Sequence, residues 1–250
     1  MLVTGATGFI GSHVLRILVE EGCDVHGLIR PESDLRRVEA LLPRVGVVRA
    51  DLYDTEAITA HLERLRPDLC VHLAWTTEPG KYLRSLENLK LLEASWKLAS
   101  RLAEAGCKRL VAAGTCFEYD IDAGYLSEQT PTRPRTLYAA AKVSLALLLE
   151  QLQSSTGMEV AWVRLFYQYG PHEDERRLVP SVILSLLQDR PAAVSAGTQV
   201  RDFLHVEDVA RAISAVARSG LTGPVNVGSG QPVTVREVVA TIGALTGRPD

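Results

Sequence analysis

Three glycines at three-residue spacing near the start of the chain separate an apolar run from a helical pattern. In "LVTGATGFIGSHV" the run Leu2–Thr4 predicts a strand, and a helix is expected to begin near Phe9. Glycine tolerates positive φ and close backbone contact, so Gly5 suits a tight turn and Gly11 suits close packing of the helix on the strand. Gly8 would let an anion approach the N–H groups at the helix start. The alternative is a turn that only connects two elements.

The same alternation of strand and helix patterns continues along the chain. Its strands are rich in Val and Leu without polar alternation, which indicates a parallel sheet covered on both faces. Repeated strand–helix order predicts a doubly wound α/β fold. The expected strands are Leu2–Thr4, Asp24–Ile29, Val45–Arg49, Leu69–Leu73, Arg109–Ala113 and Val160–Leu165. The expected helices are Ser12–Glu21, Thr55–Leu65, Ser85–Ala105 and Leu137–Gln153.

After Tyr169 the alternation loosens. "GPHEDERR" is a polar loop, and Leu178–Gln188 is expected to be a helix. "GTQVRDFLH" predicts a strand that leads into a further helix, and "PVNVGSG" predicts a strand that ends in a turn. A last helix is expected near Val233–Thr246. The sequence ends soon after this helix, so we expect a small or trimmed C-terminal lobe.

Composition narrows the possible partners. The 27 basic and 30 acidic residues give a net charge of −3 and form no basic block, so we expect no nucleic-acid partner. No apolar run approaches the roughly 20 residues that span a bilayer, and no signal-peptide pattern is present, so we predict a cytoplasmic protein without a membrane partner. The four cysteines and six histidines are dispersed, which predicts reduced thiols and no metal site.

The stretch "TLYAAAK" carries the candidate chemistry. Tyr138 and Lys142 lie four residues apart, so a helix places them on one face. A free phenol has a pKa of about 10, and a nearby ammonium favours the phenolate. We therefore expect Lys142 to lower the pKa of Tyr138, so that the phenol exchanges a proton with a hydroxyl or a ketone. The alternative is an ordinary pair on an exposed helix.

Taken with five further motifs, this pattern resembles the extended short-chain dehydrogenase/reductase family, in its NAD-dependent epimerase/dehydratase, nucleotide-sugar-modifying branch. The motifs are TGxxGxxG, "ADLYD", "VHLAW", "RLFYQYGP" and "RDFLHVEDVA", and the matches run from Leu2 to about Gly230. The resemblance implies a Rossmann domain that binds a dinucleotide, whose oxidised nicotinamide would act together with Lys142 to favour the phenolate of Tyr138. The cofactor-binding residues that it implies are Gly5, Thr7, Gly8, Phe9, Ile10, Gly11, Arg30, Asp51, Leu52, Leu73, Ala74, Tyr138 and Lys142.

Arg30 bears on the choice of dinucleotide. An acidic residue at the end of the second strand would bind a ribose 2′-hydroxyl and select NAD. Arg30 stands there instead, and a guanidinium suits a 2′-phosphate by charge and by bidentate geometry. We therefore predict NADP, with NAD as the alternative if Arg30 is an ordinary surface arginine.

In "AAGTCFEYD" the resemblance places the third catalytic residue at Thr115, for which a capping threonine at a strand end is the alternative. The 4,6-dehydratase branch has Thr-Asp-Glu, whereas this chain has Thr115-Cys116-Phe117, which disfavours dehydration. Glu118 is the remaining carboxyl that could face the substrate. Cys116 has no histidine placed by motif as its base, so we expect no thiol chemistry.

The C-terminal motifs imply a nucleotide-diphosphate sugar as substrate. Tyr167 stands where the family has a substrate-binding Asn, and Arg201 is the candidate phosphate ligand, unless it pairs with Asp202 or Asp208. A further phosphate arginine is common in the family beyond the point where this chain stops. We expect a dinucleotide-binding domain over residues 1–165 and a substrate lobe over 166–250, with segments about 198–230 returning to the first domain.

The resulting prediction is an NADP-dependent nucleotide-sugar oxidoreductase that reduces a 4-keto-deoxysugar, with Tyr138 as proton donor. The alternatives are an epimerase that uses tightly bound NAD and a non-catalytic dinucleotide-binding regulator. The resemblance also implies a homodimer through Ser85–Ala105 and Leu137–Gln153. Asn88 falls where the family has a helical Asn, although a polar helix face explains it equally well.

Overall fold

Seven parallel strands form the main sheet in the order β3-β2-β1-β4-β5-β6-β9. The computed structural model describes residues 1–248. The strands are β1 (Leu2–Thr4), β2 (His26–Ile29), β3 (Gly46–Arg49), β4 (Leu69–His72), β5 (Arg109–Thr115), β6 (Glu159–Leu165) and β9 (Gly223–Val227). The chain builds outward from β1 to β3 and then resumes on the other side of β1 with β4. This reversal confirms the predicted doubly wound fold and puts a switch point between β1 and β4, where such sheets bind ligands.

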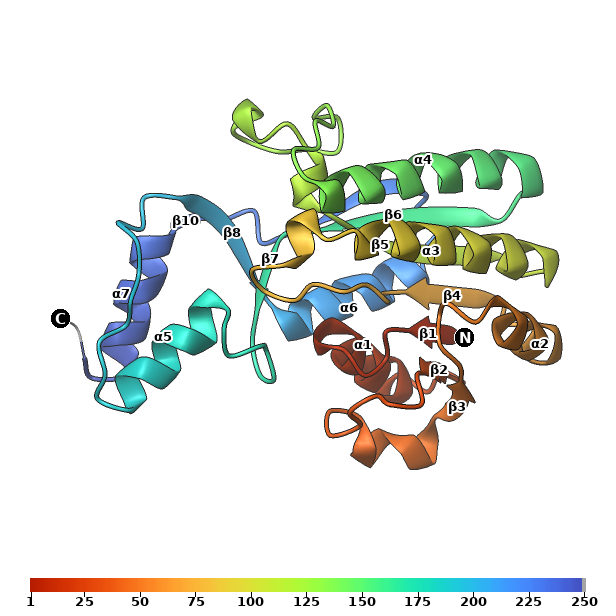
Figure 1. Cartoon of the computed structure of the whole chain (residues 1–250), viewed down its shortest axis with the longest axis horizontal. Coiled ribbons are helices and arrows are strands. Elements are labelled where there is room, and N and C mark those ends of the chain that lie inside the picture. The colour runs from red at the N-terminus through yellow and green to blue at the C-terminus, as the bar shows by residue number, and fades with distance from the viewer. Residues whose placement is uncertain (249–250) are drawn as a thin grey trace.

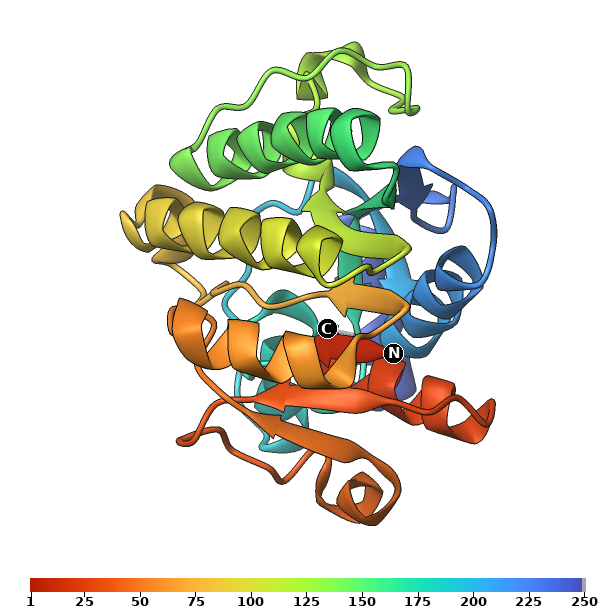
Figure 2. The same cartoon turned by 90° about the vertical axis from the view of Figure 1, so that its right-hand side faces the viewer.

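Helices cover both faces of this sheet (Figures 1 and 2). One face packs against α2 (Thr55–Leu65), α3 (Glu87–Glu104) and α4 (Leu137–Thr156), and the other against α1 (Phe9–Glu20), α6 (Val206–Ala217) and the 3₁₀ helix η1 (Glu39–Arg44). Each face has its own apolar core. Because each fully buried leucine contributes about 1.5–3 kcal/mol, these two cores supply most of the drive to fold.

A second, three-stranded sheet forms a lobe beside the main sheet (Figure 1). It has the order β10-β8-β7, with β7 (Tyr167–Tyr169), β8 (Val200–His205) and β10 (Pro232–Thr234). Helices α5 (Leu178–Leu187) and α7 (Val235–Leu245) pack on each other in this lobe. Strand β8 leads directly into α6, so the chain returns from the lobe to the main sheet. The last two residues of the predicted lobe, 249–250, lie outside the described residues.

The local signals fix some helix ends better than others. The bounds of α2 are those expected, because Asp54 caps its first turn and Arg66 ends it in the left-handed region. Helix α1 starts at Phe9, as the glycine turn predicted, and so three residues before the helical pattern that was expected from Ser12. Strand β5 runs two residues beyond Ala113. The shortest elements were not predicted, because segments of so few residues are too short to show a periodic pattern. They are the strands β7 and β10 and the 3₁₀ helices η1, η2 (Tyr82–Arg84), η3 (Cys116–Glu118) and η4 (Ile121–Ala123).

Candidate active site

The glycine turn between β1 and α1 is built almost entirely from backbone. Gly5 has φ +68° and its carbonyl accepts a hydrogen bond from the Gly8 N–H at 2.9 Å. A Cβ at Gly11 would lie 2.0 Å from the Gly5 oxygen, so the predicted close packing is present. A Cβ at Gly5 would lie 2.8 Å from the nitrogen of Ala74, just after β4. No side chain caps the start of α1, so the first turn of the helix can serve an anion at the switch point.

Arg30 and Asp51 follow the neighbouring strands β2 and β3 at the same edge of the sheet. Arg30 is exposed directly after β2, and the Asp51 carboxylate accepts a hydrogen bond from the Tyr53 N–H at 2.9 Å. Both charges act on the Tyr53 phenol, whose pKa is raised mainly by burial, so the two side chains lie in one neighbourhood. Arg37 was not predicted as a site residue. Its guanidinium donates to the carbonyl of Thr7 in the glycine turn at 3.5 Å.

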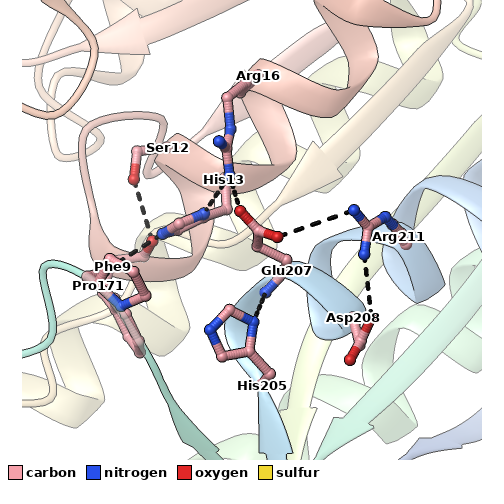
Figure 3. Close-up of polar contacts among 9 residues, drawn as sticks. All are labelled: Phe9, Ser12, His13, Arg16, Pro171, His205, Glu207, Asp208 and Arg211. Atoms are coloured by element: carbon pink, nitrogen blue, oxygen red, sulfur yellow. Dashed lines mark hydrogen bonds and ion pairs between the residues drawn. The ribbon is translucent and has the colours of Figure 1, made fainter.

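A polar network joins α1 to the segments that follow β7 and β8 (Figure 3). Arg16 donates to the His13 Nδ1 at 2.9 Å and to the Glu207 carboxylate at 2.7 Å. Because Nδ1 accepts, the ring carries its proton on Nε2, which donates to the Pro171 carbonyl at 3.3 Å. Burial lowers the pKa of His13, in keeping with a neutral ring. The network therefore fixes the loop after β7 and the start of α6 against the helix of the glycine turn.

The structure brings together the three predicted catalytic residues. Thr115 ends β5, while Tyr138 and Lys142 occupy successive turns at the start of α4, whose first turn is capped by Thr136. Their exposed fractions are 6%, 7% and 3%. The Thr115 side chain lies near the phenol of Tyr138 and acts to lower its pKa. These residues therefore lie in the protein interior, which excludes the interpretation of "TLYAAAK" as an ordinary exposed pair.

Lys142 does not by itself lower the pKa of Tyr138 in this structure, and its joint effect with an oxidised nicotinamide stays a prediction. Burial raises the pKa of Tyr138, and the Thr115 hydroxyl only partly opposes that rise. The Lys142 Nζ instead donates to the Ala113 carbonyl at 2.8 Å and lies 3.6 Å from the centroid of the Trp75 ring. Burial also lowers the pKa of Lys142 to about 7, with the charge of Glu118 acting in the opposite direction. The phenol is thus held in its protonated state.

Two aromatic rings that the sequence did not identify enclose Tyr138. The Tyr82 ring packs edge-on at a centroid distance of 4.9 Å, and the Trp75 ring packs similarly at 6.3 Å. Trp75 is the last residue of the "VHLAW" motif, so its place beside the site could have been inferred. Tyr82 comes from η2, where no sequence motif marks it. Arg177, at the start of α5, stacks on Tyr82 at 5.4 Å and so connects the lobe to this side of the site.

Glu118, the remaining carboxyl that could have faced a substrate, turns away from the candidate site. Its carboxylate is fully buried and accepts hydrogen bonds from the Thr115 N–H, the Trp162 indole N–H and the Arg164 guanidinium, at 2.8–3.0 Å. Every partner lies on β5 or β6, so the side chain turns into the protein beneath the site. Cys116 is also buried, and burial raises the pKa of its thiol to about 12, which suits an inert side chain.

The two predicted substrate-binding residues are adjacent. The Arg201 guanidinium lies 5.1 Å from the centroid of the Tyr167 ring, because β7 and β8 pair. The Tyr167 ring also packs against Phe117 at 5.9 Å and Phe203 at 5.7 Å. The alternative partners of Arg201 are engaged elsewhere within residues 1–248. Asp202 accepts from the N–H groups at 229 and 230, and Asp208 pairs with an arginine on its own helix.

Other candidate sites lie away from these residues. A cavity of about 340 Å³ opens at the opposite, N-terminal ends of β2 and β3, lined by His26, His61 and Arg64 among others. Within residues 1–248 no group of three or more His, Cys, Asp or Glu side chains could hold a metal ion, and all four cysteines are free. None of the helices in that range has the length and apolar character needed to cross a membrane.

Fold and site together define a Rossmann-type protein with a short-chain dehydrogenase arrangement of Thr, Tyr and Lys. The chain belongs to the NAD dependent epimerase/dehydratase family, whose model matches residues 1–228. This confirms the family expected from the motifs.

Among characterised proteins the chain is similar to members with different reactions. It is 29% identical to a probable dTDP-glucose 4,6-dehydratase of Sinorhizobium fredii, over 97% of this chain and 75% of that protein. It is 26% identical to a dTDP-4-dehydro-6-deoxy-D-allose reductase of a Streptomyces species, over 100% and 82%. The crystal structure of the Thermus thermophilus UDP-glucose 4-epimerase in complex with NAD superposes with a TM-score of 0.85 and 27% identity, over 99% and 83%.

Proposed function

We propose that this protein is an NADP-dependent nucleotide-sugar oxidoreductase that reduces the 4-keto group of a deoxysugar nucleotide. The observation that carries the proposal is the environment of Thr115. Cys116 and Phe117 stand where a dehydratase would have carboxyls, and Glu118 is sealed in a buried ion pair with Arg164. The residues beside Tyr138 therefore offer a proton donor and a hydroxyl but no acidic pair for an elimination.

The nucleotide turn fits a dinucleotide. Gly5 and Gly11 allow contacts that any Cβ would block, and α1 begins without a side-chain cap. Asp51 would bind the adenine and Arg30 a 2′-phosphate, which supports NADP over NAD. When bound, the reduced nicotinamide supplies the hydride that the carbonyl carbon gains.

Side chains of this protein would then act on the carbonyl oxygen of the sugar. The Thr115 hydroxyl donates a hydrogen bond to the substrate carbonyl, and Tyr138 donates the proton that the oxygen gains as the carbon is reduced. Solvent later returns a proton to Tyr138. Burial raises the pKa of Tyr138, so the phenol is protonated at neutral pH, which is the state that reduction needs. Arg201, stacked on Tyr167, would bind the diphosphate of the sugar nucleotide.

An epimerase that uses tightly bound NAD is the second candidate, favoured by the likeness to the Thermus thermophilus enzyme. A thymidine diphosphate 4-keto-6-deoxyhexose incubated with NADPH separates the two. We expect one reduced nicotinamide to be consumed for each sugar reduced, measured by absorbance and by mass spectrometry of the product. Interconversion of sugar epimers with no net loss of reduced nicotinamide would establish the epimerase instead. Binding of NADPH without turnover of any nucleotide sugar would establish a regulator.

The choice of NADP is tested by Arg30→Ala. A charge-assisted hydrogen bond is worth about 1.5–3 kcal/mol, so the NADPH affinity should fall by about 10- to 100-fold. NADH lacks the 2′-phosphate, so its affinity measured on the same variant is the control and should stay the same. Equal losses for both nucleotides would mean that Arg30 does not read the 2′-phosphate.

The quaternary structure belongs to the same proposal. Helices α3 and α4 pack side by side, and α4 exposes 58% of Leu147 and 39% of Leu148, while Leu89 of α3 is 48% exposed. We infer a cytoplasmic homodimer that covers this apolar surface with the same surface of a second copy. Sedimentation of the wild type should give a dimer, and Leu147→Glu should give a monomer. A monomeric wild type at micromolar concentration would overturn it.

A further inference from the structure

The ammonium of Lys142 is covered by an aromatic ring instead of a carboxylate. Its Nζ lies 3.6 Å from the Trp75 ring centroid, and the Ala113 carbonyl at 2.8 Å is its hydrogen-bond acceptor among the described residues. A buried ammonium ordinarily requires a paired anion, because desolvation penalises the charge. Glu118 is the nearby anion, but its oxygens are taken by Thr115, Trp162 and Arg164. Besides the Ala113 carbonyl, the Trp75 ring is therefore the group in contact that can stabilise the charge, while the Trp162 ring lies farther away at 5.9 Å.

The Trp75 ring is itself fixed in place. Its indole N–H donates to the Asn88 side-chain oxygen at 2.9 Å. The amide nitrogen of Asn88 donates to the carbonyls of Tyr82 at 2.6 Å and Ser85 at 2.8 Å, and Asn88 is almost fully buried. Turning the indole would break its hydrogen bond and move Tyr82, which packs on Tyr138. Asn88 therefore supports Trp75. These hydrogen bonds explain why Asn88, a polar residue of helix α3, is buried.

We propose that Trp75 is a positioning residue that acts through Lys142, holding the ammonium charged and directed at the end of β5. Attraction between a cation and an aromatic face is strongest when both are desolvated. Lys142 is 3% exposed and no carboxylate among residues 1–248 touches it, so the Trp75 ring is the side chain in contact that favours the protonated amine. The inference rests on the proposed function only through Lys142, which the resemblance places at the bound dinucleotide.

The other titratable groups around Lys142 do not stabilise its ammonium by direct contact. His72 on β4 is held between the Thr4 hydroxyl at 2.7 Å and the Ser95 hydroxyl at 2.9 Å. Burial lowers the pKa of His72 to about 3, so the ring is neutral throughout the working range. Glu118 from η3 acts on Lys142 only by charge, and the phenol of Tyr138 on α4 stays protonated. A change at Trp75 therefore leaves the neighbouring charges as they are.

The test measures the protonation of Lys142 directly. The chain has only five lysines, so labelling their ε-carbons with ¹³C gives a simple spectrum, in which Lys142→Met identifies the Lys142 signal. We expect Trp75→Leu to lower the midpoint of the Lys142 titration by about one pH unit, and Trp75→Phe, which keeps an aromatic face, to lower it by less. Trp96→Leu on α3 is the matched control and should leave the midpoint unchanged. An unchanged or raised midpoint in Trp75→Leu would overturn the proposal.

A second measurement connects the ring to the reaction. The pH profile of kcat/KM with the nucleotide sugar should shift in the same direction and order: Trp75→Leu most, Trp75→Phe less, Trp96→Leu not at all. The titration needs no substrate, so absent reductase activity would overturn the proposed function and leave the titration to decide this one. A wild-type pH profile in Trp75→Leu, with activity present, would overturn the part assigned to Trp75 alone.

Discussion

The glycine turn and the Thr115–Tyr138–Lys142 site are built in opposite ways. The turn uses the backbone of one continuous segment, and its constraints are contacts within that segment and with the residues after β4. The Thr115–Tyr138–Lys142 site uses side chains from β5 and α4, enclosed by rings that come from the loop after β4 and from η2. A site made of local backbone geometry can be recognised from spacing alone. For a site made of side chains, the sequence can indicate which residues take part, but not their protonation states or their hydrogen-bond partners.

The strongest test of the side-chain site is Tyr138→Phe. Removing a positioned proton donor lowers turnover by about 10²- to 10⁴-fold, equivalent to about 3–5.5 kcal/mol of transition-state stabilisation. NADPH affinity and the unfolding midpoint should change little, because the ring and its packing remain. Tyr125→Phe, at a tyrosine that is 83% exposed, is the control. Wild-type turnover in Tyr138→Phe would mean that Tyr138 is not the proton donor of the reaction.

Glu118→Gln asks whether the buried carboxylate is structural. The substitution leaves Arg164 without its anion and turns an amide donor toward N–H groups, so we expect a loss of about 3–5 kcal/mol in the free energy of unfolding. Denaturant unfolding measures it, with the exposed Glu150→Gln as control. A variant of normal stability that has lost turnover would show that Glu118 acts on the substrate.

Gly11→Ala tests the backbone-built site. The new Cβ would meet the Gly5 oxygen at 2.0 Å, so α1 must shift away from β1. Overpacking of this kind costs about 1–3 kcal/mol, and dinucleotide affinity should fall with it. Gly220→Ala is the matched control, since nothing lies within 4 Å of that position and its φ is not in the left-handed region. Equal stability and equal cofactor binding in the two variants would contradict the role of close packing.

The smallest expected effect is the dependence of stability on pH. Lys142 has an ordinary pKa of 10.5, and burial lowers it to about 7 in the folded protein. Above pH 7 the unfolded chain therefore binds more protons than the folded one, so stability rises with pH by at most about 1.4 kcal/mol per pH unit. From pH 7 to about 8.5, before thiols of the unfolded chain ionise, the wild type should gain stability relative to Lys142→Met. Parallel curves for the two proteins would mean that Lys142 is not desolvated.

Much of the fold and several residues of the candidate site could be predicted from the sequence. Strand and helix patterns predicted the doubly wound sheet. The family resemblance put Thr115, Tyr138 and Lys142 in one site, and the contact of α4 with β5 brings these residues together. Neither Tyr82 nor Arg177 could be found this way. Each reaches the site across a loop whose path depends on the packing of the lobe.

The sequence by itself determined the glycine turn, the order of elements and the family, because sterics at a glycine and periodicity along a segment act between near neighbours. Only the tertiary structure decided that Glu118 turns inward to Arg164 and that Lys142 lies on Trp75. The reason is physical. The charge and direction of a buried side chain are set by its desolvation and its hydrogen-bond partners, and those partners come from strands and loops far away in the chain.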